Sequence, residues 1–134
     1  MLTPPSGQSQ SRTDPSLIDR LELTAGRVLF ALLFFAGAIQ KGLNPDPAQA
    51  LLSGFGLPIG LIWPALIFNA VAAVFLIVNL HIRPTARALA AYCLITSAFH
   101  YVPDDPWQMS IMIKNWAIAG GCFALSQAAG RSNR

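Results

Sequence analysis

The pattern of apolar residues divides the chain into long hydrophobic stretches separated by short polar breaks. The clearest stretch runs from Leu57 to Leu80 and contains no charged residue. About 20 apolar residues cross a hydrocarbon core of about 30 Å as a helix, and this stretch is long enough. Asn69 lies at its midpoint, so its amide is expected near the bilayer centre. A polar group at that depth should face other helices rather than lipid.

Three other apolar stretches have similar lengths, and clear breaks separate them. Arg83-Pro84 is a very short connection, so the spans on either side of it should be antiparallel neighbours. The pattern therefore predicts an all-α integral membrane four-helix bundle with antiparallel spans. The spans are expected at about residues 23–42, 57–80, 85–102 and 109–129.

The two ends of the chain are predicted to be polar tails around one membrane domain of residues 17–129. Residues 1–16 are rich in Pro, Ser, Gln and Gly and cannot bury a core, and residues 130–134 are also polar. Asp14-Pro15 is typical of a helix start. As an alternative, the first span resembles a signal peptide, but the 27 residues before its apolar run favour an uncleaved span.

The loop between the first two spans contains signals for a short helix. Asp46-Pro47 favours a helix start, and Gly54 favours a stop. With Leu51, Leu52 and Phe55, this helix could lie on the membrane surface as a lid. The sequence favours the other interpretation, an ordinary capped connector.

Composition and charge agree with a membrane location. Charged residues make up 11% of the chain, which is low compared with roughly 25% in soluble domains. The net charge of +3 comes from residues that flank apolar runs, so it does not predict nucleic-acid binding. With four spans, Lys41 and Lys114 fall on one side, and seven arginines fall on the other. By the positive-inside rule both termini are then cytoplasmic. The seven are Arg12, Arg20, Arg27, Arg83, Arg87, Arg131 and Arg134.

Polar residues from four segments are predicted to gather near the outer ends of the spans. Placing them by helix rise predicts a polar vestibule that opens outward, with Asn69 at its floor. Ionisable groups in membrane spans are candidate functional groups, although lysines also snorkel to the interface and the other residues serve as interfacial anchors. The candidate ligand-binding residues are Lys41, Asn69, His100, Lys114 and Asn115.

Asn69 and several glycines also have a structural interpretation. A single buried asparagine fixes helix pairing through an interhelical hydrogen bond, and Thr96 or Ser97 are possible partners. Gly37, Gly120 and Gly121 have small-residue spacings that let helices approach closely, so we predict that they are packing positions.

The sequence contains no complete catalytic constellation. It has no Ser/His/Asp set, nucleotide-binding loop or cluster of metal ligands, so we predict no metal site. Cys93 and Cys122 are expected at similar depths and could be neighbours, but buried apolar thiols are usually inert.

Four segments resemble the DoxX family of bacterial inner-membrane proteins. The first span, RVLFALLFFAGAIQKGLNP, resembles the opening of these proteins, and GFGLP resembles the loop before their second span. IRPTA is similar to their basic turn, and IKNWAIAGG to the start of their last span. Family members commonly carry a glutamate in the middle of the second span, where this chain has Asn69. Asparagine does not ionise, which puts a proton-coupled role in doubt.

The resemblance implies a four-span inner-membrane protein that serves a redox system linked to quinone or sulfur compounds. It implies no intrinsic cofactor, a quinone as a possible ligand, and other membrane or redox proteins as partners within the lipid bilayer. One alternative is a non-catalytic assembly or stabilising subunit of a larger membrane complex. Another is a small multidrug-type transporter, but Glu22 is the only acid near a span and lies at its inner edge.

Overall fold

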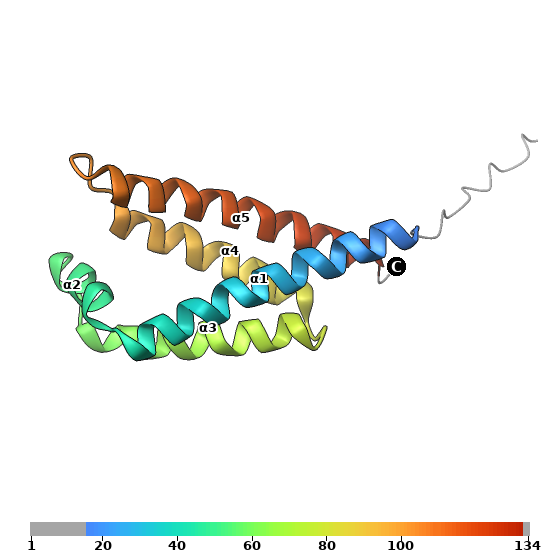
Figure 1. Cartoon of the computed structure of the whole chain (residues 1–134), viewed down its shortest axis with the longest axis horizontal. Helices are drawn as coiled ribbons and strands as arrows, with labels where there is room; N and C mark the ends of the chain where they lie inside the picture. The colour runs from blue at the N-terminus through green and yellow to red at the C-terminus, as the bar shows by residue number, and fades with distance from the viewer. Residues whose placement is uncertain (1–15, 133–134) are drawn as a thin grey trace, which may run out of the picture.

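The computed structural model describes residues 16–132, and these residues form an all-α protein. Four long helices lie in two pairs, α1 with α3 and α4 with α5 (Figure 1). Of the tails predicted at 1–16 and 130–134, residues 1–15, including Asp14-Pro15, and residues 133–134 lie outside the described residues, whereas residues 130–132 belong to the last long helix. The long helices are α1 (Leu17–Leu43), α3 (Ile62–Ile77), α4 (Ile82–Ser97) and α5 (Pro106–Ser132).

Three short helices complete the chain: α2 (Asp46–Gly54), η1 (Ile59–Leu61) and η2 (Ala98–His100). The short helix predicted between Asp46 and Gly54 is therefore present as α2. After α2, the Phe55 ring packs edge-on against Phe99 of η2, with the ring centroids 5.2 Å apart. This contact brings the α2 loop towards the second helix pair at one end of the molecule (Figure 1).

Local side-chain caps explain where α1 and α5 begin. Ser16 accepts a hydrogen bond from the Asp19 backbone N–H at 3.1 Å, and the Asp19 carboxylate accepts one from the Ser16 backbone N–H at 2.9 Å. This reciprocal capping box satisfies donors that the first helical turn leaves free. At α5, the Asp105 carboxylate accepts from the Trp107 backbone N–H at 2.9 Å, and Pro106 occupies the first helical position.

A tight turn reverses the chain between α3 and α4. Asn79 has φ 59° and His81 has φ 48°, both in the left-handed region. Asparagine tolerates this region better than most residues, whereas a histidine there is uncommon. The turn makes α3 and α4 antiparallel, as the short connection predicts.

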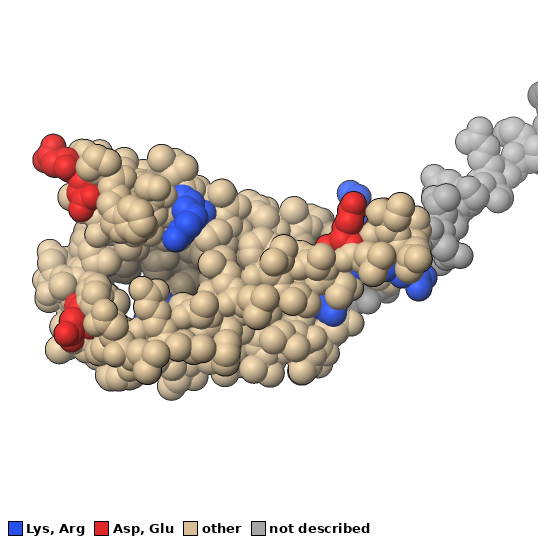
Figure 2. Space-filling model, viewed as in Figure 1, with Lys and Arg blue, Asp and Glu red and all other residues tan. Residues whose placement is uncertain are grey.

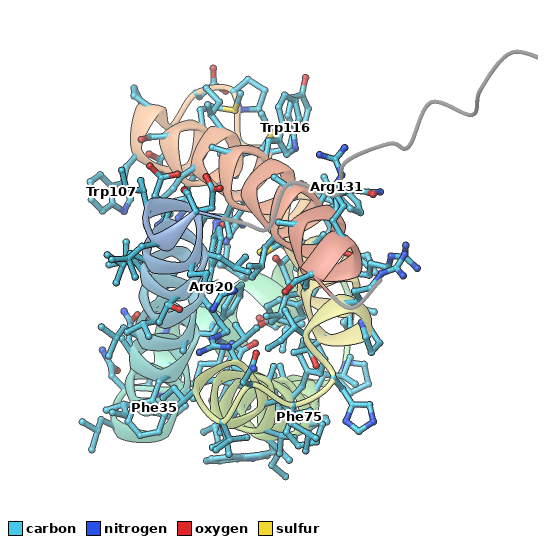
Figure 3. All side chains as sticks on the ribbon, turned by 90° about the vertical axis from the view of Figure 1, so that its right-hand side faces the viewer. Arg20, Phe35, Phe75, Trp107, Trp116 and Arg131 are labelled. Atoms are coloured by element: carbon cyan, nitrogen blue, oxygen red, sulfur yellow. The ribbon has the colours of Figure 1, made fainter. Side chains whose placement is uncertain are left out.

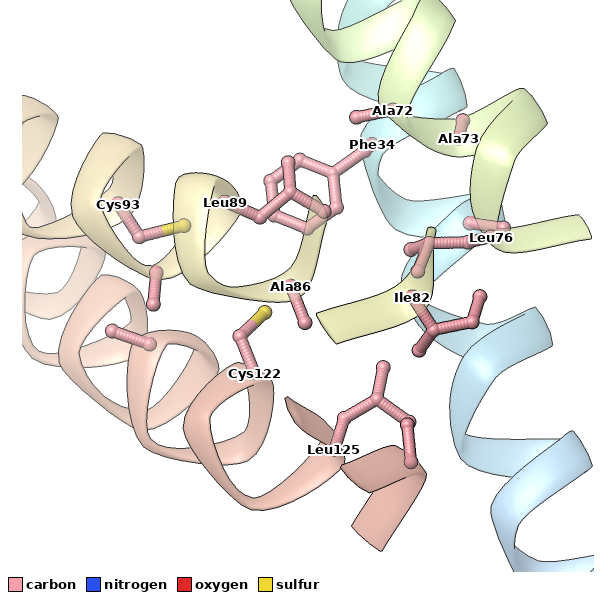
Figure 4. Close-up of a cluster of buried hydrophobic side chains, with 14 residues drawn as sticks. Phe34, Ala72, Ala73, Leu76, Ile82, Ala86, Leu89, Cys93, Cys122 and Leu125 are labelled. Atoms are coloured by element: carbon pink, nitrogen blue, oxygen red, sulfur yellow. The ribbon is translucent and has the colours of Figure 1, made fainter. Parts of the chain in front are cut away.

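Small residues form much of the shared core. Ala31, Ala73, Ala86 and Ala90 have no exposed surface, so the helix backbones approach closely at these positions. Larger side chains fill the space between the pairs, and Figure 4 shows Phe34 of α1 lying beside Leu89 of α4. The core therefore joins all four long helices.

The outer surfaces of all four long helices are apolar. Leu29 on α1, Ile67 on α3, Ile95 on α4 and Ile113 on α5 are between 58 and 66% exposed. A soluble monomer rarely exposes such extensive apolar surface. Two helical stretches, Leu17–Leu43 and Ile59–Ile77, are long and apolar enough to cross a membrane. These features are those of a helical membrane protein.

The neighbouring glycines of α5 are predicted to respond differently to alanine. A Cβ atom at Gly121 would lie 2.6 Å from the Phe30 Cζ of α1, whereas one at Gly120 would meet nothing of the described chain within 4 Å. Overpacking costs about 1–3 kcal/mol, while alanine favours a helix over glycine by about 1 kcal/mol. We expect Gly121→Ala to be less stable than Gly120→Ala by about 1–3 kcal/mol in thermal unfolding in detergent.

A Phe30→Ala change provides the control for this comparison. Combined with Gly121→Ala, it should remove most of the difference, because the clashing ring is gone. Equal stabilities of the two single glycine variants would contradict a close contact between α1 and α5 at this position.

Candidate functional site

Asn69 is the most deeply buried polar residue among the predicted site residues. It lies on α3 and is only 2% exposed. Its Oδ1 atom is buried without a hydrogen-bond partner in the described part of the chain. An unpaired buried acceptor typically costs about 1–3 kcal/mol, so this oxygen requires an explanation.

Lys41 of α1 lies beside Asn69. The Lys41 side chain is half-buried, and its ammonium donates to the Gly37 carbonyl of its own helix at 3.3 Å. A Cβ atom on Gly37 would lie 3.7 Å from Lys41 Nζ and 3.8 Å from Asn69 Nδ2, so both groups lie over this glycine. Since an ammonium has three N–H donors, the Gly37 bond leaves two of them for a ligand.

Helix α4 adds two side chains to this group. The Tyr92 phenol lies within interaction range of the Asn69 side chain, and its ring packs against Phe68 at 5.3 Å between centroids. The buried Cys93 thiol lies within electrostatic range of both Lys41 and Lys114. Lys41 on α1 is half-buried, whereas Lys114 on α5 is exposed.

The other two candidate residues make different contacts. His100 Nδ1 lies 2.6 Å from the Gln108 Oε1, so this imidazole links η2 to the first turn of α5. Asn115 is half-buried and makes no side-chain hydrogen bond within residues 16–132. The structure thus brings Lys41 and Asn69 together and gives His100 a separate partner.

The α4 hydroxyl groups bond mainly to their own helix. Thr96 donates to the Tyr92 carbonyl at 2.9 Å, and Ser97 donates to the Leu94 carbonyl at 2.6 Å. Ser97 also accepts a hydrogen bond from the Trp116 indole at 3.1 Å, which joins α4 to α5. Neither hydroxyl is a partner for Asn69.

The end of the molecule that contains α2 has a hollowed surface. Figure 2 shows the surface hollowed there, between the α2 loop and the α4–α5 pair. Asp46 begins α2, and Asp104 and Asp105 lie in the turn before α5, so acidic residues surround this end. We call Lys41, Asn69, Tyr92, Cys93 and Lys114 the lysine–amide site.

The family comparison covers three of the four long helices. A family model described as DoxX matches residues 23–101, which are 79 of the 134 residues. The chain belongs to the DoxX family. Comparison with curated proteins and with solved structures finds no match. The match includes Lys41, Asn69 and Cys93 of this DoxX protein but ends before α5, so Lys114 lies outside it.

The lysine–amide site offers donors and acceptors but no complete catalytic set within residues 16–132. Lys41 and Asn69 Nδ2 are hydrogen-bond donors, and Asn69 Oδ1 is a free acceptor. In the same part of the chain, no group of three His, Cys, Asp or Glu residues is arranged to hold a metal ion. Cys93 and Cys122 are both free and buried. The arrangement suits binding of a small polar group better than acid–base catalysis.

The sequence did not identify Tyr92 as a candidate site residue, and it led us to expect an inert thiol at Cys93. Tyr92, Cys93 and Thr96 have helical spacings that place them on one side of α4, and this pattern was the available signal. Among the predicted packing glycines of this DoxX protein, Gly37 lies under Lys41 and Gly121 lies against Phe30.

Replacing Asn69 by leucine is predicted to preserve stability. The change removes the unpaired acceptor and keeps a similar volume, so the free energy of unfolding should change by less than about 1 kcal/mol. Leu76→Ala on the same helix is the control, because Leu76 is fully buried and its truncation should cost about 2–5 kcal/mol. Thermal unfolding in detergent measures both. A loss for Asn69→Leu as large as for Leu76→Ala would show that the amide makes a structural hydrogen bond.

Proposed function

We propose that this protein is a four-span inner-membrane subunit of a redox system, and that its lysine–amide site binds a small polar group such as a quinone head. The observation that carries the proposal is that the buried Asn69 Oδ1 has no hydrogen-bond partner in the described chain, while the Asn69 Nδ2 and the Lys41 ammonium both lie over Gly37. A ligand that accepts from Lys41 and donates to Asn69 would satisfy both groups. The family membership supports the membrane location of this binding function.

The charge distribution supports the proposed orientation. Lys41 and Lys114 belong to the α2 end, whereas Arg20, Arg27 and Arg83 line a cavity at the opposite end. Because basic residues favour the cytoplasmic side, that opposite end and both chain termini would be cytoplasmic. The lysine–amide site would then open towards the outer face of the inner membrane.

The chemistry of the lysine–amide site fits a quinone. A quinone supplies a two-electron, two-proton couple, and its carbonyl oxygens accept hydrogen bonds. Lys41 would donate to one oxygen, and the Asn69 amide would donate to an oxidised head or accept from a reduced one. The Tyr92 ring, which Phe68 supports at 5.3 Å between ring centroids, would pack against the flat ring. A small oxidised sulfur anion would instead be held by Lys41 and Lys114.

The assembly function is the second candidate, and one observation favours it. A Cβ atom added at Gly120 would meet no other part of the described chain within 4 Å, and Trp116 and Phe123 near it are 52 and 47% exposed. A glycine beside exposed aromatic residues is suited to close contact with another transmembrane helix. A bulky Gly120→Leu change would disrupt such a complex while sparing the fold of the single chain.

The binding proposal is tested by measuring quinone retained by the protein after purification in a mild detergent. Lys41→Met keeps the length of the side chain and removes its charge, so retained quinone should fall by about tenfold, the loss expected for one charge-assisted hydrogen bond. Asn69→Leu should lower retention to a similar extent without unfolding the protein. Extraction followed by mass spectrometry provides the measurement.

His100→Ala is the matched control, because His100 is bonded to Gln108 instead of the lysine–amide site. It should retain quinone at the level of the unmodified protein. If purified protein carries no quinone and added quinone does not raise its melting temperature, the binding proposal is wrong. Loss of a co-purifying complex in Gly120→Leu alone would favour the assembly function.

A further inference from the structure

A polar cavity, which we call the arginine cavity, lies at the end of the molecule opposite the lysine–amide site. Its volume is about 540 Å³, within the range of small-molecule sites. The first turns of α1, the turn between α3 and α4, and the last turns of α5 form its walls. Figure 3 looks along the molecule from this end and shows Arg20 facing the space between the helices, whereas Arg131 points outward.

Within the described chain, three arginines and no acidic residue line this cavity. Arg20 and Arg27 come from α1, and Arg83 comes from the start of α4. The Nε atoms of Arg27 and Arg83 are buried and have no hydrogen-bond partner within residues 16–132. Arg27 uses another guanidinium nitrogen to donate to the Asn79 side chain, which fixes its position. The cavity thus holds buried donors that no acceptor of the described chain satisfies.

The start of α4 adds backbone N–H donors at this end of the molecule. Its N-cap residue, His81, makes no side-chain capping bond in the part of the chain that the structure describes, so N–H groups of the first turn remain free. The helix dipole also favours negative charge at this point. Together with the arginines, these groups are suited to a phosphate.

An apolar groove begins where this cavity ends. The groove has a volume of about 440 Å³, lies between α3 and α4, and shares His81 and Pro84 with the arginine cavity. Apart from His81 and Thr85 its walls are apolar, and they include Phe68, Val71, Phe75 and Ala88. A cationic cavity that continues into an apolar groove matches an anionic head joined to an acyl chain.

We infer that this end of the protein binds an anionic phospholipid, with its phosphate among Arg20, Arg27 and Arg83 and one acyl chain in the α3–α4 groove. Anionic lipids of the cytoplasmic leaflet attract basic groups at the same depth. Gly130 is a positioning residue for Arg83, since a Cβ atom there would lie 2.8 Å from the Arg83 Nε. The glycine lets the guanidinium lie flat against α5.

In a purely structural interpretation, the positive charge of Arg83 only stabilises the negative C-terminal end of the α5 helix dipole. That interpretation predicts a loss of stability when Arg83 is replaced, in any lipid. Lipid binding instead predicts a loss of discrimination between lipids, which a structural role would not change.

The test uses native mass spectrometry of the full chain in detergent, with phosphatidylglycerol and phosphatidylcholine in competition. We expect selective retention of phosphatidylglycerol, reduced about tenfold or more in Arg27→Gln and Arg83→Gln. Arg87→Gln and Arg131→Gln remove the same charge from residues outside the cavity and should retain the selectivity. Gly130→Ala keeps every charge, displaces only a flexible side chain, and should still weaken retention.

Two further measurements make the outcome decisive. Ala88→Phe should fill the groove and weaken phospholipid retention while leaving the arginines intact. Added inorganic phosphate alone should not raise the melting temperature as phosphatidylglycerol does. The proposal would be overturned if all four arginine variants lost selectivity equally. It would also be overturned if inorganic phosphate raised the melting temperature as much as phosphatidylglycerol does and Ala88→Phe had no effect on retention. Because quinone is measured separately in the same samples, failure here does not affect the lysine–amide site.

Discussion

The absence of hydrogen-bonding solvent in a bilayer core is the constraint on which this structure depends. Lipid offers no partner to an amide or an ammonium, so such groups must turn towards other helices. Asn69 follows this rule with a side chain that is 2% exposed, in a helix whose lipid-facing residues are apolar. The small residues at Ala73, Ala86 and Ala90 then let neighbouring helices approach closely enough to surround polar groups. The close packing of the helices and the inward position of the polar groups therefore both follow from the lack of hydrogen-bonding solvent in the bilayer core.

The two ends of the bundle meet this constraint in different ways. At the α2 end, Lys41 lies beside a buried amide, while Asp46 and Asp104 remain exposed. At the other end, arginines from α1 and α4 surround a cavity whose walls contain no acidic residue from the described part of the chain. Each end thus has buried polar atoms without a partner in the described chain. At the α2 end the atom is an acceptor, Asn69 Oδ1, and at the other end the atoms are donors, the Nε of Arg27 and of Arg83.

Much of the fold could be predicted because membrane helices follow simple rules. The long apolar runs predicted four helices, the Asp46-Pro47 and Gly54 signals predicted α2, and the Arg83-Pro84 break predicted an antiparallel turn. Helix ends were less accurate, because η1 and η2 lie at the edges of the apolar runs. Depth along each span predicted a vestibule with Lys41 at the outer end and Asn69 below it, but depth contains no information on rotation about the helix axis. For that reason the sequence did not predict that His100 pairs with Gln108 or that Tyr92 faces Asn69.

The arginine cavity is a second feature that the sequence could not predict. In the sequence, Arg20, Arg27 and Arg83 are only charges on one side of a membrane, because the positive-inside rule needs no contact between them. Their convergence depends on Asn79, whose left-handed backbone lies in the turn and whose side chain accepts from Arg27. It depends also on Gly130, where a side chain would displace Arg83.

The neutral amide at position 69 sets the kind of ligand that the lysine–amide site favours. The resemblance to DoxX proteins implies that relatives commonly have a glutamate at this position, which would pair with a nearby lysine. In this chain Asn69 carries no charge, so the adjacent Lys41 ammonium has no carboxylate partner within residues 16–132. A half-buried ammonium without a counterion is stabilised by an electron-rich acceptor more than by a neutral donor. In the proposed function, the exchange of an acid for an amide would replace an internal ion pair with a site for an acceptor or an anion.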